Sequence, residues 1–122
     1  MTRRLGTITF LLVGLLAARS DLAGAQLQGQ VIRIGIGAPL TGGAASFGVE
    51  MKNAVELAVD EENIAGGVLG ARIETRAFDD EASDATGQAG AGVLCQDPAV
   101  LAVVGHVNSN VSMAAQIGRA HV

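Results

Sequence analysis

The stretch over residues 31–48 constrains the fold of this chain more than any other. Its sequence, VIRIGIGAPLTGGAASFG, opens with an apolar and β-branched run that is too short to span a membrane and typical of a buried strand. Closely spaced glycines and Pro39 then end the run and predict a loop before a helix. Because ligands bind at the carboxyl ends of strands in open α/β sheets, we expect this loop to form part of one wall of a ligand site.

The rest of the chain alternates between helical and extended patterns. The predicted β-α-β-α-β order indicates an α/β fold with a parallel sheet and right-handed crossovers. The 122 residues leave room for one small domain at most. The elements expected after the first loop are a helix over residues 48–64, an edge strand over 71–78, a helix over 84–96, a central strand over 100–104 and a further helix from Val111 or Ser112.

Residue spacing supports these elements. Apolar residues recur at helical spacing from Met51 to Val59, and Ser46 and Asp84 are the expected N-caps of the first two helices. The strand expected over residues 71–78 alternates in polarity, which indicates an edge position with one wetter face. The next strand, VLAVV, is apolar on both faces, which favours a central position.

Three glycines weaken the second helix. Gly87, Gly90 and Gly92 each cost about 1 kcal/mol relative to alanine in a helix interior. We therefore expect this helix either to lie very close to the sheet or to be marginal.

The first 25 residues have the pattern of a cleaved export signal. Arg3 and Arg4 precede a mainly apolar run over residues 5–18, and Ala-Gly-Ala follows just before Gln26. We expect cleavage before Gln26 and a location in the periplasm or otherwise outside the cytoplasm. Residues 26–122 then form the domain, except for IGRAHV at residues 117–122, which matches a translated sequencing adapter and is expected to be artefactual.

Charge and cysteine content exclude several classes of partner. From Gln26 onward the chain has five basic and eleven acidic residues, which argues against a nucleic-acid partner. The single cysteine, Cys95, excludes an intrachain disulfide and any metal site that needs two cysteines. Cys95 falls in a predicted helix and is interpreted as a packing or surface residue.

A nucleotide-binding loop does not fit the first turn. Gly35 and Gly37 begin like G-x-G-x-x-G, but Leu40 occupies the place of the last glycine. Pro39 also lacks the N–H that a phosphate would need. We therefore expect no nucleotide cofactor.

The acidic turn could suggest calcium, because Asp79, Asp80, Glu81 and Asp84 lie close together. In the spacing of an EF-hand loop, however, Asp84 occupies the glycine position and the closing glutamate is missing. We interpret the segment as a solvated acidic turn with a helix cap, and expect no metal.

Two residues near the third strand differ in what they indicate. His106 stands alone and is interpreted as a packing or hydrogen-bonding residue, and no catalytic set is apparent around it. Ser109 lies where a helix begins, so its hydroxyl and the free helix N–H groups suit a carboxylate. Ser109 could equally be only a helix N-cap, and the residues alone leave both roles open.

Several segments together resemble a known family. GAPLTG, AGGVLG, the acidic turn and VVGHVNS are similar to the leucine/isoleucine/valine-type periplasmic binding proteins, the substrate-binding subunits of branched-chain amino-acid ABC transporters. The resemblance covers residues 31–116. It implies a type I periplasmic binding fold, in which a ligand is trapped between two closing α/β lobes, with this chain as the truncated βαβαβ start of the first lobe.

The resemblance also implies site residues and partners. Ser109 would hold a ligand carboxylate and Phe47 would cover its apolar part. A disulfide found in some members joins positions that Ser83 and Asn108 occupy here, so that bridge is absent. The implied function is amino-acid binding without catalysis or cofactor, for an inner-membrane permease. The alternatives are a ligand-sensing receptor module of the same fold and, with less support, a nucleotide-dependent α/β enzyme.

Overall fold

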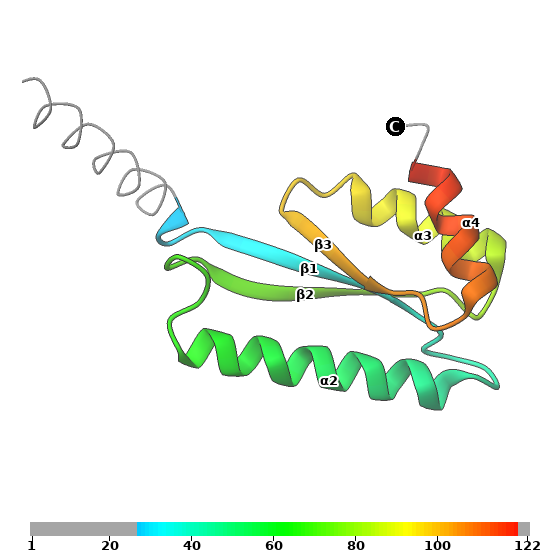
Figure 1. Ribbon diagram of the computed structural model, residues 1–122, viewed down its shortest axis with the longest axis horizontal. Coiled ribbons are helices and arrows are strands. Elements are labelled where there is room, and N and C mark those ends of the chain that lie inside the picture. The colour runs from blue at the N-terminus through cyan, green and yellow to red at the C-terminus, as the bar shows by residue number, and fades with distance from the viewer. Residues whose placement is uncertain (1–26, 120–122) are drawn as a thin grey trace, which may run out of the picture.

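The computed structural model describes residues 27–119, so the expected signal segment and the last three residues lie outside the described part. Helices and strands alternate in the predicted order (Figure 1). The elements are β1 (Val31–Ala38), α2 (Ala45–Ile64), β2 (Arg72–Asp79), α3 (Asp84–Cys95), β3 (Val100–Gly105) and α4 (Ser109–Arg119).

The three strands form a parallel sheet in the order β2-β1-β3. The predicted edge position of β2 is confirmed. The predicted central position of β3 is wrong: within the described residues it pairs only with β1, and Leu101 is 65% exposed. An apolar strand sequence indicates that both faces can be buried, but it does not determine which strands lie beside it.

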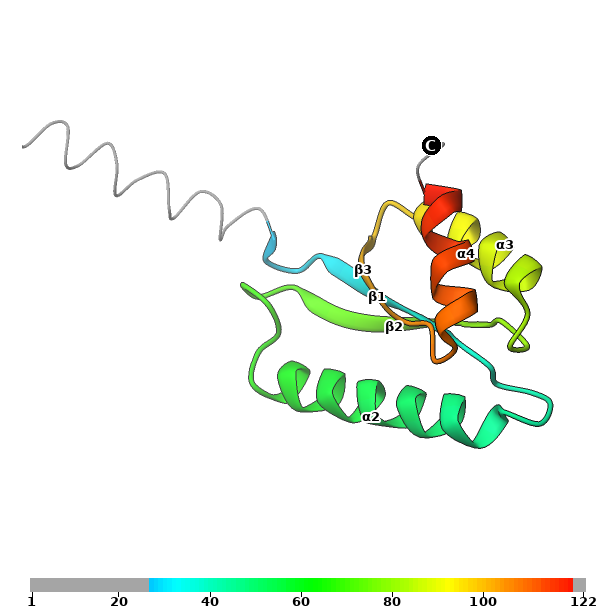
Figure 2. The same cartoon turned by 45° about the vertical axis from the view of Figure 1, so that its right-hand side comes forward.

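The helices cover the two faces of the sheet unequally. Helix α2 lies along one face, while α3 and α4 lie together against the other (Figures 1 and 2). On one side of the sheet, Ile32, Ala71 and Ile73 form a buried cluster. Leu94 from α3 and Val111 from α4 are also fully buried. Burial of these aliphatic side chains holds the layers together.

Helix α2 begins three residues earlier than predicted, at Ala45. Its N-cap is Ala44, which makes no side-chain capping bond, and Ser46 lies inside the first turn. The prediction of Ser46 as the cap is therefore wrong. The loop backbone starts the helix instead, because the Ala45 N–H donates to the Gly42 carbonyl at 3.3 Å.

The N-cap of α3 is Ser83, one residue before the predicted Asp84. The Ser83 hydroxyl accepts a hydrogen bond from the Thr86 N–H at 3.4 Å. Asp84 is the first helical residue, where its charge favours the positive end of the helix dipole.

The surroundings of the three glycines in α3 decide between close packing of this helix and a marginal helix, the two alternatives that the sequence left open. A Cβ on Gly87 would overlap Val111, and a Cβ on Gly90 would overlap the Phe78 ring. Nothing lies within 4 Å of the Cβ position of Gly92. Two of the three glycines therefore let α3 approach its neighbours closely, whereas the third is open.

An ion-pair cluster joins strands β1 and β2 to the loop between α3 and β3. The Asp97 carboxylate accepts hydrogen bonds from the Ala99 N–H at 3.0 Å, Arg76 at 2.6 Å and Arg33 at 3.1 Å. These groups stabilise the charged form and hold the pKa of Asp97 below its ordinary value.

Acid should therefore weaken the fold through Asp97. The pKa of this carboxyl is lower in the folded state than in the unfolded chain, so the folded state binds fewer protons. The stabilisation is complete above about pH 4 and is lost as the pH falls through the lowered pKa. In denaturant unfolding, Asp97→Asn should be less stable than the wild type at about pH 6, and this difference should shrink towards about pH 2. A gap of equal size at both pH values would contradict the prediction.

Candidate functional site

The carboxyl ends of the three strands meet at one edge of the sheet, where the strands end at Ala38, Asp79 and Gly105. In a parallel sheet this is the edge at which ligands bind. The loops that leave it lead into α2, α3 and α4, whose N-termini also lie there. The predicted residues Phe47 and Ser109 are both at this edge, on α2 and α4.

Asp79 ties the end of β2 to the loop that follows β1. Its carboxylate accepts hydrogen bonds from the Leu40 N–H at 2.8 Å, the Thr41 hydroxyl at 2.6 Å and the Glu81 N–H at 3.0 Å. Partial burial raises the pKa of this carboxyl, but the bonds from Thr41, Leu40 and Glu81 outweigh it, so the pKa lies below its ordinary value. Asp79 is therefore a charged acceptor that fixes the first loop.

Asp80 is fully buried, with an exposed fraction of 0%. Its Oδ2 lies 2.5 Å from Nδ1 of His106, and its Oδ1 accepts the Ala82 N–H at 2.9 Å. The interpretation of the acidic segment as a solvated turn is thus wrong for Asp80, because the histidine and the turn amide replace its water. The interpretation of His106 as a hydrogen-bonding residue is confirmed.

Ser109 is the first residue of α4, which begins two or three residues before the predicted start at Val111 or Ser112, and its side chain is exposed. One turn later, the Ser112 hydroxyl donates to the carbonyls of His106 and Asn108, both at 3.2 Å. Oδ1 of Asn108 is buried without a hydrogen-bond partner among the described residues. The Ser112 hydroxyl therefore fixes the backbone just before α4 through these two carbonyls. Ser109 itself is exposed to solvent.

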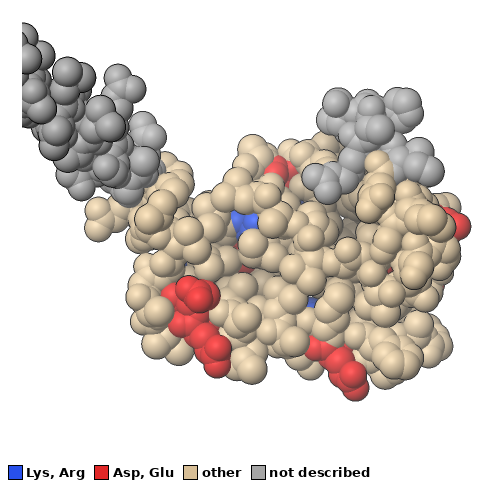
Figure 3. Space-filling view, viewed as in Figure 1, with Lys and Arg blue, Asp and Glu red and all other residues tan. Residues whose placement is uncertain are grey.

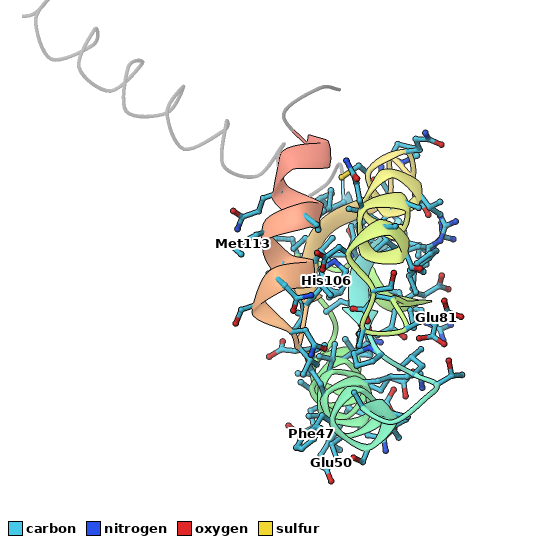
Figure 4. All side chains as sticks on the ribbon, turned by 90° about the vertical axis from the view of Figure 1, so that its right-hand side faces the viewer. Phe47, Glu50, Glu81, His106 and Met113 are labelled. Atoms are coloured by element: carbon cyan, nitrogen blue, oxygen red, sulfur yellow. The ribbon has the colours of Figure 1, made fainter. Side chains whose placement is uncertain are left out.

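Phe47 lies in the first turn of α2 and is 64% exposed. Figure 4 shows Phe47 and Glu50 on α2, apart from His106, which lies near α3 and α4. A small hollow of about 100 Å³ lies between α3, α4 and β3, and neither Phe47 nor Ser109 lines it. The two expected ligand residues thus face solvent at the same edge.

Comparison with known proteins identifies the family of this chain. A family model for periplasmic binding proteins matches residues 31–118. The chain belongs to the periplasmic binding protein family. Leu/Ile/Val-binding protein homolog 2 of Brucella abortus is 44% identical to it over 82 residues, which are 67% of this chain and 22% of the relative. The chain thus spans about a quarter or less of the length of the relatives it matches.

Solved structures of this family share the fold. The branched-chain amino acid transporter substrate binding protein LivJ from Streptococcus pneumoniae, in complex with isoleucine, matches with a TM-score of 0.70 and 32% identity, over 75% of this chain and 26% of that one. An ABC transporter substrate-binding protein from Desulfitobacterium hafniense, in complex with Leu, matches with a TM-score of 0.64 and 35% identity, over 73% and 25%. The βαβαβ unit therefore matches part of a type I periplasmic binding fold.

Sequence reasoning missed the structural roles of Asp79 and Asp80 and the pairing of Asp80 with His106. The sequence shows only that two consecutive acids end one extended segment and that a histidine follows the next strand, which places them at the same edge of a parallel sheet without indicating that they pair. No group of three metal-ligating side chains is arranged for a metal ion within residues 27–119. The acids instead bind loop amides and the histidine.

Acidic residues outnumber basic residues in the described part of the chain. The face drawn in Figure 3 carries separate acidic side chains and little basic surface. None of the helices over residues 27–119 has both the length and the apolar character needed to cross a membrane.

Proposed function

We propose that this chain is the opening part of the first lobe of an exported solute-binding protein that captures an amino acid for an ABC transporter. The observation that carries the proposal is the similarity to Leu/Ile/Val-binding relatives, together with an exposed serine at a helix start on the ligand-binding edge. No catalytic chemistry is needed, because lobe closure alone would exclude water and trap the ligand.

Each proposed site residue addresses one part of such a ligand. The similar proteins from S. pneumoniae and D. hafniense were solved with isoleucine and Leu. Both amino acids combine a carboxylate with a branched apolar side chain. Ser109 would donate its hydroxyl to the carboxylate, supported by the positive end of α4, and Phe47 would cover the apolar part. The second lobe would supply the opposite wall and the groups for the ammonium.

Substitution of Ser109 by alanine should weaken ligand binding by about 10- to 100-fold, since a hydrogen bond to a charged group contributes about 1.5–3 kcal/mol. The experiment is calorimetry on the complete protein that carries this segment, titrated with leucine, isoleucine and valine. Ser46→Ala is the matched control, because Ser46 is also an exposed serine in a first helical turn but makes no capping bond.

The outcomes separate the function from the residue. If the complete wild-type protein binds none of these amino acids, the amino-acid assignment fails. If it binds them and Ser109→Ala binds as well as Ser46→Ala does, Ser109 is not a ligand residue. Permease and ATPase genes beside the gene would support transport, whereas a sensor kinase partner would contradict it.

A further inference from the structure

The end of β2 lies directly beside the start of the first loop. Asp79 pairs in register with Ala38, the last residue of β1, and the Asp80 N–H donates to the Ala38 carbonyl at 3.0 Å. Consecutive residues of an extended chain point to opposite faces of a sheet. Two adjacent acids at this place can therefore serve the layers on both sides of the sheet.

Asp79 serves the layer that contains α2. Its carboxylate holds the Leu40 N–H and the Thr41 hydroxyl, at 2.8 and 2.6 Å. The loop that begins with these residues leads within a few residues into the first turn of α2. That turn carries Phe47, so Asp79 fixes the base of the segment that presents Phe47.

Asp80 serves the layer that contains α4. Its side chain and that of His106 are 0% and 6% exposed, and they lie 2.5 Å apart. A Cβ on Gly37 would approach Cε1 of the His106 ring to 2.6 Å, so the glycine of β1 leaves the room that the ring occupies. Ser109 follows His106 by three residues, and the His106 carbonyl accepts the Ser112 hydroxyl. Asp80 thus fixes the loop that presents Ser109.

We propose that Asp79 and Asp80, with His106, are positioning residues that set the two ligand groups, Phe47 and Ser109, in their relative places. This inference rests on the proposed function, since it assumes that both groups contact the ligand. The device is one turn that holds two loops from opposite layers. The binding surface is then already ordered before the ligand arrives, which reduces the entropy lost on binding.

Alanine variants of the two acids test the proposal in the complete protein. Asp79→Ala and Asp80→Ala should each weaken leucine binding about tenfold, the loss equivalent to about 1.4 kcal/mol. They should also speed amide hydrogen exchange, over residues 39–47 for Asp79→Ala and over residues 106–112 for Asp80→Ala.

Glu81→Asn is the matched control. Glu81 carries the same charge in the same turn, and its side chain has one long hydrogen bond, from the Thr86 hydroxyl at 3.5 Å. Asparagine tolerates the positive φ of 53° found at this position. The control should therefore leave both the affinity and the exchange of the two loops unchanged.

Coupling to Ser109 distinguishes positioning from general support of the fold. In a Ser109→Ala background, Asp80→Ala should weaken binding less than twofold further, because the group it positions is gone. Asp80→Asn should restore most of the affinity, since an amide can accept from Ala82 and donate to the histidine ring. A tenfold loss that persists in the Ser109→Ala background would overturn the proposal.

The remaining outcomes separate the positioning proposal from the proposed function. If Asp80→Ala does not fold, Asp79→Ala decides through its affinity and the exchange of residues 39–47, because Asp79 is only half-buried. If the wild type binds no amino acid, the proposed function fails, while loop exchange still tests the positioning. If the wild type binds leucine and both alanine variants behave like Glu81→Asn, the positioning proposal fails and the proposed function stands.

Discussion

Replacement of Gly48 by alanine is expected to lower the free energy of unfolding by about 3 kcal/mol, the upper end of what overpacking costs. Gly48 is the buried residue of α2, and a Cβ there would overlap the carbonyl group of Pro39. The obstacle is backbone, which cannot rotate away as a side chain can. Either α2 or the loop after β1 must therefore shift. Denaturant unfolding of the complete protein measures the loss.

Gly92→Ala is the matched control for this prediction. Gly92 also lies inside a helix, but nothing is within 4 Å of its Cβ position. The substitution should stabilise the protein by up to about 1 kcal/mol, because alanine has the higher helix propensity. Equal effects at the two glycines would show that α2 does not lie as close to Pro39 as described.

Asn63→Ala should destabilise the protein by about 2 kcal/mol, about 1 kcal/mol for each hydrogen bond lost. From the last turn of α2, Asn63 donates its amide to the Ile73 carbonyl and accepts the Ile73 N–H, both at 2.8 Å. These two groups lie on the free side of the edge strand β2, where no other strand pairs with them within the described residues. The side chain thus takes the place of a strand neighbour.

Asn53→Ala provides the comparison on the same helix. Asn53 is exposed, so its loss should be neutral or stabilising by up to about 0.7 kcal/mol through helix propensity. Thermal and denaturant unfolding of the two variants give the contrast. If Asn63→Ala unfolds with the same midpoint as Asn53→Ala, the paired hydrogen bonds to Ile73 do not contribute to stability.

The order of elements could be predicted because it depends on local patterns. Apolar β-branched runs, helical spacing and glycine-rich breaks are all short-range features, and they located every strand and helix over residues 31–119 to within a few residues. The helix starts were less accurate. The cap of α3 was displaced by one residue because Ser83 and Asp84 are both good caps, and only the backbone conformation of Ser83 decides between them.

The candidate site could be predicted only in outline. The resemblance to the leucine/isoleucine/valine-type periplasmic binding proteins indicated Phe47 and Ser109 as ligand residues. The structure places both at the carboxyl edge of the sheet, and their contact with a ligand stays a proposal. The burial of Asp80 against His106 was not predicted, because the two residues are 26 positions apart and nothing local marks them as partners. Long-range pairs of this kind depend on strand order.

The sequence by itself therefore determined the alternation of strands and helices and hence the parallel sheet, since hydrophobic spacing and turn residues act over a few neighbours. Only the tertiary structure decided which strand lies at the centre and which glycines are close contacts. It also decided that Asp79 binds the loop after β1 and that Asp80 binds the loop after β3. The physical reason is that neighbours in space are chosen by how whole elements pack, and an acid is solvated or buried according to what that packing brings beside it.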